Sequence, residues 1–273
     1  MKKLRIGVVG VGRGKSMMHY CEQAENAELV AICDKWEAGL ERTKRELNDD
    51  RISYFTDYDS FLAHDIDCVM LANYANQHAP FAIKAMESGK HVISEVLPAQ
   101  NMAEAVKLIE TVEKTGMTYC YAENYCYMDH SFEMRRRYEE GAIGEVTYAE
   151  GNYIHDCESI WLDITYGETD HWRNRLPPTF YCTHSLGPIM TITGHRPVQV
   201  VGFENPPIEA FYRLGHPGGH PSGIEMVTLD NGAIVKSIHG PLKLEPSRIA
   251  YQVFGTKGFL GGSAEDMNVH LYQ

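Results

Sequence analysis

The feature of this sequence that most constrains its fold is the alternation, over the first 123 residues, of short apolar runs and longer amphipathic segments. Each apolar run has the length and composition of a strand buried on both faces, and each amphipathic segment has helical spacing. Such an alternation predicts a parallel, doubly wound α/β sheet, as in a Rossmann domain. We expect strands at 4–10, 27–33, 66–72, 90–95 and 117–122, a short further strand within 51–58, and helices at 15–25, 36–47, 77–88 and 102–115.

The pattern changes in the second half of the chain. Helix-like segments at 129–140 and 181–193 accompany strand-like runs separated by turn residues, and a loop is expected between the strand at 145–156 and the second helix. We therefore expect two domains, 1–123 and 124–273, the second an α+β domain built on a mainly antiparallel sheet with one or two helices. The sequence ends just after a strand-like run, so we expect the chain to be truncated there or its tail to pair with a partner.

Composition and charge exclude several classes of function. The formal net charge of −12 argues against a nucleic-acid surface, which needs a basic face. No apolar run approaches the roughly 20 residues of a membrane span. Seven cysteines without a C-x-x-C pair favour a reducing cytoplasm. We expect no metal site. The pair His216 and His220 lies in a Gly/Pro loop, where a built site would be untypical, and an adventitious ion is the alternative there.

A glycine-rich turn follows the first predicted strand and opens the first predicted helix. Its third glycine, Gly14, falls one position earlier than in the pattern G-x-G-x-x-G. In a dinucleotide-binding fold the first glycine allows the tight turn and the second lets the backbone approach the pyrophosphate at the helix N-terminus. We assign Gly10, Gly12, Arg13 and Gly14 to a cofactor site; a plain glycine-rich turn is the alternative.

Asp34 ends the second predicted strand, at the spacing expected of a carboxylate that binds the cofactor ribose. Two negative groups ~4 Å apart repel by about 4 kcal/mol at an effective dielectric near 20, which disfavours a 2′-phosphate there. The sequence therefore predicts NAD in preference to NADP. A solvated carboxylate at a strand end is the alternative interpretation.

The segments GVGRG, CD, ANYANQH and GKHVISE, in this order, resemble the glucose–fructose oxidoreductase/inositol dehydrogenase (Gfo/Idh/MocA) family. In that family the glutamate that ends the last segment is followed by Lys-Pro. The lysine lies between nicotinamide and substrate, where it helps move the hydroxyl proton. Here Glu95 is kept, but Val96 replaces the lysine and cannot transfer a proton. The resemblance implies contacts to NAD from Asn73, Tyr74, His78, Glu95 and Val96.

One branch of the family, the NAD-dependent glycoside hydrolases typified by α-N-acetylgalactosaminidase, also has Glu-Val at this place. Three further segments resemble that branch: AENY (122–125), GNYIHD (151–156) and YCTHSLGP (181–188). They imply that Asn124 binds NAD and that the sugar is bound by Tyr153, Tyr181, Thr183 and His184. Leu97, inserted before the proline, departs from the pattern.

Oxidation of a secondary alcohol by NAD needs a base for the hydroxyl proton. We assign this chemistry to His184, at the start of an apolar helix whose dipole favours the neutral imidazole, and to Tyr153. His155 lies on the same strand face as Tyr153, while Trp172 and Arg173 belong to a loop with a carbohydrate-like mixture of aromatic and charged residues. A local helix cap, a half-buried strand pair and a solvated loop are the respective alternatives.

The sequence thus predicts a cytoplasmic NAD-dependent oxidoreductase acting on a ring hydroxyl of a sugar or glycoside. The alternative is a redox-neutral, NAD-dependent glycoside hydrolase that works through a 3-keto intermediate, and a second alternative is a non-catalytic NAD-binding sensor or subunit. From the resemblance we expect a homo-oligomer, either a dimer or a tetramer, because an open antiparallel sheet in this fold commonly pairs between subunits.

Overall fold

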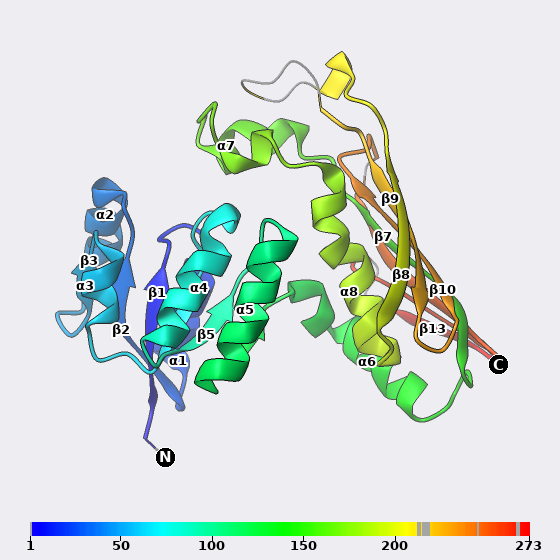
Figure 1. Cartoon of the computed structure of the whole chain (residues 1–273), viewed down its shortest axis with the longest axis horizontal. Coiled ribbons are helices and arrows are strands. Elements are labelled where there is room, and N and C mark those ends of the chain that lie inside the picture. Colours follow the sequence, from blue (N-terminus) through cyan, green and yellow to red (C-terminus); the bar gives the residue numbers. More distant parts are fainter. Residues whose placement is uncertain (1, 212–213, 215–218, 245, 266–267) are drawn as a thin grey trace. The chain divides into compact units, whose positions relative to one another are not determined.

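A computed structural model describes residues 2–211, 214, 219–244, 246–265 and 268–273 (Figure 1). The chain forms two compact units, Met1–Ala122 and Glu123–Gln273. His216 lies outside the described residues. Among the residues that are described, no helix is both long and apolar enough to cross a membrane.

The first unit is built on a six-stranded parallel sheet in the order β3-β2-β1-β4-β5-β6. Buried apolar residues form one core on each face, around Phe61 and Met86 on one side and around Met18 and Leu40 on the other. The predicted doubly wound sheet is therefore confirmed. Its strands are β1 (Leu4–Val9), β2 (Ala27–Cys33), β3 (Ser53–Phe55), β4 (Cys68–Leu71), β5 (His91–Ser94) and β6 (Tyr119–Tyr121).

The helices of this unit follow the predicted amphipathic segments, with one addition. A short helix, α3, was not predicted; it starts where the Asp57 carboxylate accepts a hydrogen bond from the Ser60 N–H. At the other end of the unit, Gly116 closes a helix in the left-handed conformation, with φ of 66°. The helices are α1 (Lys15–Gln23), α2 (Glu37–Leu47), α3 (Tyr58–Leu62), α4 (His78–Glu87), preceded by the 3-10 turn η1 (Ala75–Gln77), and α5 (Met102–Thr115).

The second unit is built on a seven-stranded sheet in the order β13-β12-β11-β7-β10-β9-β8. Only the pairing of β7 with β10 is parallel in the part of the chain that the structure describes, so the sheet is mixed and mostly antiparallel, as predicted. Its strands are β7 (Val146–Ile154), β8 (Pro197–Glu204), β9 (Gly223–Leu229), β10 (Ile234–Gly240), β11 (Arg248–Gly255), β12 (Phe259–Ser263) and β13 (Val269–Tyr272).

The helices of the second unit are α6 (Asp129–Glu139), α7 (Trp161–Thr165) and α8 (Cys182–Thr193). The prediction of one or two helices missed α7, which lies in the expected loop together with the 3-10 turns η3 (Glu158–Ile160), η4 (Trp172–Asn174) and η5 (Pro178–Tyr181). The physical reason is local anchoring: the Trp161 indole donates to the Asn174 side chain, and Asn174 is itself buried. Hydrogen bonds between side chains leave no hydrophobic periodicity in the sequence, so the sequence pattern did not indicate this helix.

Helices α6 and α8 cover one face of the second sheet, and the opposite face carries exposed apolar side chains. Ile189 and Ile192 of α8 pack against the sheet beside Tyr251. On the opposite face, Phe203 of β8 is 67% exposed and Met226 of β9 is 40% exposed. This unit therefore differs from the first in having an uncovered sheet face.

Candidate active site

The glycine-rich turn lies between β1 and α1, and backbone geometry requires glycine at two of its positions. Gly10 has φ of +101°, and a Cβ there would lie 2.5 Å from the Ala72 carbonyl oxygen. A Cβ on Gly14 would lie 2.3 Å from the carbonyl oxygen of Gly10. Gly12 and Arg13 are exposed at the tip of the turn. The turn thus has the tight, glycine-dependent form that is typical of a dinucleotide-binding turn.

Asp34 connects this turn to the end of β2. One carboxylate oxygen accepts a hydrogen bond from the Val11 N–H and the other accepts one from the Trp36 N–H, each at 2.9 Å. The structure therefore brings Asp34 directly beside the glycine-rich turn. This is where a dinucleotide fold holds the ribose.

The predicted residues after β4 and β5 take two different environments. Asn73 and Tyr74 are partly exposed, and the ammonium of Lys35 lies 4.9 Å from the centre of the Tyr74 ring. His78 is only 1% exposed: its ring nitrogens lie 2.8 Å from the Leu97 carbonyl oxygen and 3.1 Å from that of Asn73. Burial lowers the pKa of His78. His78 thus holds together the two segments that follow β4 and β5.

Glu95 and Val96 directly follow β5 and are both half-buried. The Glu95 N–H donates to the Leu71 carbonyl, which continues the pairing with β4, and the Val96 N–H lies 3.2 Å from a carboxylate oxygen of Glu95 itself. In the first unit, therefore, Glu95 is held by backbone contacts and has an apolar neighbour where the family has lysine.

In the second unit, His184 lies in the first turn of α8 and forms a buried pair with Glu123. The distance from His184 Nδ1 to Glu123 Oε1 is 2.7 Å, and the two residues are 5% and 3% exposed. The other oxygen of the carboxylate accepts a hydrogen bond from the Thr183 hydroxyl at 2.8 Å. Thr183 and His184 thus share one carboxylate that was not among the predicted residues.

A proline in α8 explains how the backbone at His184 is held. Pro188 has no N–H, so the His184 carbonyl four residues earlier lacks its helical donor. The Tyr251 hydroxyl, from β11, supplies that hydrogen bond at 2.8 Å. The first turn of α8 is therefore tied to the sheet at the residue that carries the imidazole.

The contact between α8 and β7 is equally close at Gly151. A Cβ on Gly151 would lie 1.8 Å from the Ser185 carbonyl oxygen, so only glycine lets the helix rest on the strand at this distance. Tyr153, two residues further along β7, points to the same face of the sheet as Gly151. The strand that receives α8 thus also supplies the tyrosine that faces His184.

Aromatic side chains surround the imidazole. The ring centres of Tyr125, Tyr153 and Tyr181 lie 5.1, 4.5 and 5.4 Å from that of His184. The Tyr153 and Tyr181 rings are stacked on each other with an interplanar angle of 12°. The two residues predicted to be catalytic, His184 and Tyr153, therefore lie side by side within one unit.

The remaining predicted sugar-binding residues join the same cluster. The Tyr153 hydroxyl lies 3.3 Å from His155 Nδ1, and Cys157 Sγ lies at the same distance from that nitrogen. The Arg173 guanidinium stacks on the Trp172 ring at 4.4 Å and hydrogen-bonds the Tyr181 hydroxyl. Three separate segments thus build one site with an aromatic wall and a cation, which suits a sugar ring face and its hydroxyls.

The protonation states of this cluster follow from burial. Burial raises the pKa of Tyr153 far above its ordinary value and that of Tyr125 to about 12, and it lowers the pKa of His155. Near neutral pH the phenols therefore remain protonated hydrogen-bond donors, and His155 remains neutral. Of the two residues predicted to be catalytic, Tyr153 is therefore a hydrogen-bond donor near neutral pH.

Sequence reasoning singled out Asn124, which is exposed at the start of the 3-10 turn η2 (Asn124–Tyr127), and missed its neighbour Glu123. One signal was available: Glu123 is the sole charged residue in the stretch YCYAENYCYM (119–128). Tyr125 and Tyr251 were also missed, since a tyrosine in an apolar strand or turn does not differ from a core residue.

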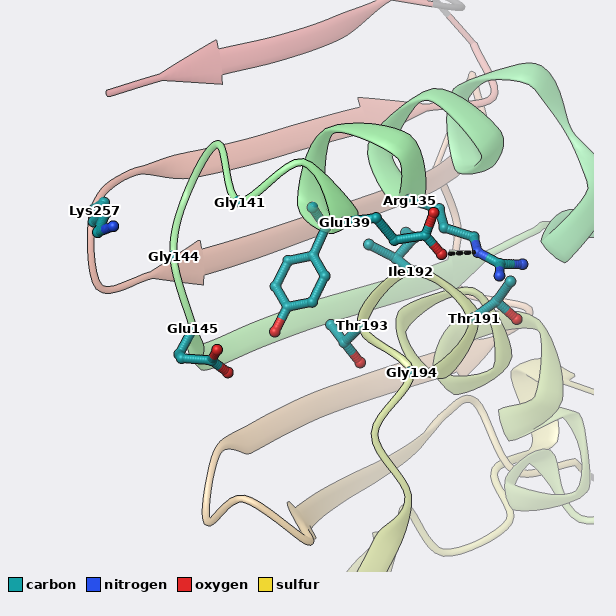
Figure 2. Close-up of a pocket in the computed structure, with 11 residues that line it drawn as sticks. Arg135, Glu139, Gly141, Gly144, Glu145, Thr191, Ile192, Thr193, Gly194 and Lys257 are labelled. Atoms are coloured by element: carbon teal, nitrogen blue, oxygen red, sulfur yellow. Dashed lines mark hydrogen bonds and ion pairs between the residues drawn. The ribbon is translucent and has the colours of Figure 1, made fainter.

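The described residues contain no group of three or more His, Cys, Asp or Glu side chains that would hold a metal ion. They do contain a cavity of about 430 Å³ at the C-terminal end of α8 (Figure 2). It is lined by Thr191–Gly194, by the end of α6 and by Lys257, and its Arg135 and Glu139 pair with each other. None of the predicted site residues lines it, so we do not assign it to the active site.

Comparisons with known proteins agree with these features. Residues 4–123 match the model of an oxidoreductase family with an NAD-binding Rossmann fold. A glycosyl hydrolase family 109 protein of Saccharopolyspora erythraea is 28% identical over 297 aligned positions, which cover 98% of this chain and 64% of that protein. An α-N-acetylgalactosaminidase of Bacteroides fragilis is 32% identical over 203 positions, covering 69% of this chain and 48% of that enzyme.

The chain thus spans between 48% and 64% of the length of these two curated relatives. Among solved structures, scyllo-inositol dehydrogenase from Lactobacillus casei, with bound NAD(H) and scyllo-inositol, has a TM-score of 0.82 at 21% identity, covering 96% of this chain and 76% of that one. At this identity the likeness concerns the fold.

The fold and the glycine-rich turn define the class: the first unit is an NAD-binding Rossmann domain of the kind found in an oxidoreductase family. More narrowly, residues 4–123 match the model of the Gfo/Idh/MocA family. The predicted family and its cofactor, NAD, are confirmed. The relatives include glycosyl hydrolase family 109 proteins, which is the branch that the motifs of the sequence indicated.

Proposed function

We propose that the chain oxidises a ring hydroxyl of a sugar or glycoside with NAD, and that this oxidation is the first step of a redox-neutral glycoside hydrolysis. The observation that carries the proposal is the His184–Glu123 pair facing Tyr153, in a chain with Val96 where dehydrogenases of the family have lysine. The names of the curated relatives support the hydrolytic outcome.

The cofactor, when bound, would accept the hydride from C3 of the sugar and later return it. The glycine-rich turn and Asp34 would hold its pyrophosphate and ribose, since the turn has the required backbone form. Asn73, Tyr74, Glu95, Val96 and Asn124 remain proposed cofactor contacts, and buried His78 would act by holding the segments around them.

In the substrate half of the site, each residue has a separate task. A carbonyl at C3 acidifies the neighbouring C2 proton, because the resulting negative charge spreads onto oxygen. Tyr153, protonated at neutral pH, would donate a hydrogen bond to that oxygen, and Nε2 of His184 would remove the proton. The C1 substituent would leave as a C1–C2 double bond forms, and water would add to C1 as C2 regains a proton. The hydride and the proton lost from the C3 hydroxyl on oxidation would then return. His155, Trp172, Arg173, Tyr181 and Thr183 would bind the sugar around them.

The test is glycoside turnover in deuterium oxide with the NAD-loaded protein. We expect release of the aglycone, deuterium at C2 of the freed sugar and no net NADH. Stoichiometric NADH with an unlabelled C2 would identify a net sugar dehydrogenase, in which case only the oxidation step of the proposal survives. Bound cofactor without turnover of any glycoside or sugar would favour the non-catalytic sensor.

We also propose that the chain forms a homo-oligomer through the uncovered face of its second sheet. The exposed apolar residues on that face support this, because monomers rarely leave such patches open. We expect Phe203→Glu with Met226→Lys to shift the protein to smaller species in sedimentation velocity, and an unchanged profile would contradict the proposed interface.

A cytoplasmic location is proposed from the free state of all seven cysteines.

A further inference from the structure

We propose that Glu123 is the positioning residue of this site: its carboxylate holds the His184 ring with the proton on Nδ1 and leaves Nε2 bare to accept one. The inference deepens the proposed function and rests on it only in naming the accepted proton as the substrate's. The tautomer itself is a property of the protein without substrate.

The hydrogen-bond partners of Glu123 suit an ionised carboxylate. The side chain is almost fully buried, and three donors point at its two oxygens: the Thr183 hydroxyl at 2.8 Å, the His184 ring at 2.7 Å and the Tyr125 N–H at 3.2 Å. A protonated carboxyl would lose one of these acceptor positions. A carboxylate buried in this way needs such a set of donors to compensate for its lost hydration.

The ionised carboxylate decides the tautomer of His184. A carboxylate only accepts hydrogen bonds, so the nitrogen beside it, Nδ1, must carry a proton. In the neutral imidazole the proton is then absent from Nε2. Within the described part of the chain, Nε2 of His184 has no hydrogen-bond partner, and it is the nitrogen left for a ligand.

The surroundings support this arrangement of the ring. The backbone at His184 is fixed from one side by the Tyr251 hydroxyl, which replaces the donor that Pro188 lacks. The ring packs against Tyr125 and Tyr153, whose ring centres lie 5.1 and 4.5 Å from its own. When Nε2 takes a proton, the new positive charge forms 2.7 Å from the carboxylate, which stabilises it.

Two substitutions at Glu123 distinguish the effect of its charge from the effect of its hydrogen-bond acceptor. Glu123→Gln keeps an oxygen for Nδ1–H but removes the charge, so the tautomer should persist while kcat falls about tenfold to a hundredfold. Glu123→Met removes both the acceptor and the charge, and kcat should fall about 10²- to 10⁴-fold, the range for loss of an orienting carboxylate and general-base catalysis. In both variants KM and the Kd for NAD should stay within threefold.

The direct readout is nitrogen NMR of this chain labelled with ¹⁵N-histidine, with His184 assigned by comparison with His184→Gln. We expect a protonated Nδ1 and a bare Nε2 in the wild type and in Glu123→Gln, and loss of that state in Glu123→Met. A bare Nδ1 in the wild type overturns the proposal. So does a Glu123→Gln variant with wild-type kcat, which keeps the test decisive if Glu123→Met does not fold.

The second buried His–Glu pair of this unit supplies the matched control. Glu225 accepts from His239 Nε2 at 2.8 Å, and both residues are buried, but neither belongs to the proposed site. Glu225→Gln should leave the His184 tautomer and kcat unchanged; an equal loss of kcat would assign Glu123 a merely structural role. If no glycoside is turned over but the NMR result holds, the proposed function fails and the positioning of His184 stands.

Discussion

The cofactor half and the substrate half of this protein differ in whether backbone or side-chain atoms form the proposed site. In the first unit the features of the proposed cofactor site belong mainly to the backbone: the positive φ of Gly10, its close approach to Ala72 and the Val11 N–H that donates to Asp34. In the second unit they are side chains that meet from distant segments, above all Glu123 and His184. A backbone site is encoded within a short stretch of sequence, whereas a side-chain site exists only after folding.

The two halves also differ in what a substitution removes. The loss of one buried partner in the Glu123–His184 pair leaves the other charged or polar group without a partner in a dry environment. In the glycine-rich turn a substitution adds an atom where no space exists. We therefore expect chemistry to fail first in the substrate half and cofactor binding to fail first in the cofactor half.

The largest effect should come from His184→Ala. Removal of the proposed base should lower kcat for glycoside turnover about 10³-fold, while the Kd for NAD stays within twofold, because a general base contributes about 10² to 10⁴. Steady-state kinetics and fluorescence titration with NADH measure both. The control is His195→Ala, which breaks an imidazole–carboxylate pair with Asp230 elsewhere in the same unit. A parallel loss of NAD binding in His184→Ala would contradict the expectation that chemistry and cofactor binding depend on different units.

Gly10→Ala should act on the other half. The new Cβ would meet the Ala72 carbonyl oxygen at 2.5 Å, and φ of +101° is unfavourable for alanine, so the turn must shift. We expect the Kd for NAD, measured by calorimetry, to rise at least about tenfold, which is 1.4 kcal/mol.

Gly116→Ala is the matched control for this prediction, because Gly116 also has positive φ but has nothing within 4 Å of the added atom. It should lower Tm by a few degrees without changing NAD affinity. Equal NAD affinities in Gly10→Ala and the wild type would show that the approach at Ala72 does not shape the cofactor site.

A smaller effect is expected from Asp34→Ala, which tests whether the cofactor half also uses a side chain. The substitution removes the charge that opposes a 2′-phosphate and frees the N–H groups of Val11 and Trp36. The ratio of the Kd values for NADP and NAD should fall about tenfold or more. Wild-type protein that binds NADP as tightly as NAD would contradict the assignment.

The smallest effect concerns the pH dependence of stability. Burial lowers the pKa of His155, so the folded state resists its protonation while the unfolded chain binds the proton as the pH falls through about 6.5. The free energy of unfolding should therefore decrease from pH 7 to pH 5.5, and His155→Gln should weaken this decrease.

Thermal melts at several pH values should show a difference of at most about 3 °C between His155→Gln and the wild type. His19→Gln, on the exposed side of α1, is the control and should keep the wild-type slope. A steeper loss of Tm in His155→Gln at low pH would reverse the sign of the argument.

The same contrast explains what the sequence predicted. The parallel sheet of the first unit follows from apolar runs that are visible one by one, and the glycine-rich turn from neighbouring residues. Helix α3 escaped because an aspartate cap on a five-residue helix leaves no periodic pattern. Glu123 escaped because its partner is 61 residues away, and no local property of the sequence joins the two.

The glycine at position 151 has a consequence for how this protein can change over evolutionary time. Because α8 meets β7 at Gly151 through backbone atoms, no side chain separates the helix from the strand at the contact beside His184 and Tyr153. Position 151 itself must remain glycine. In the sequences of an unfamiliar genome, a glycine two residues before the tyrosine therefore indicates this arrangement more specifically than the tyrosine alone.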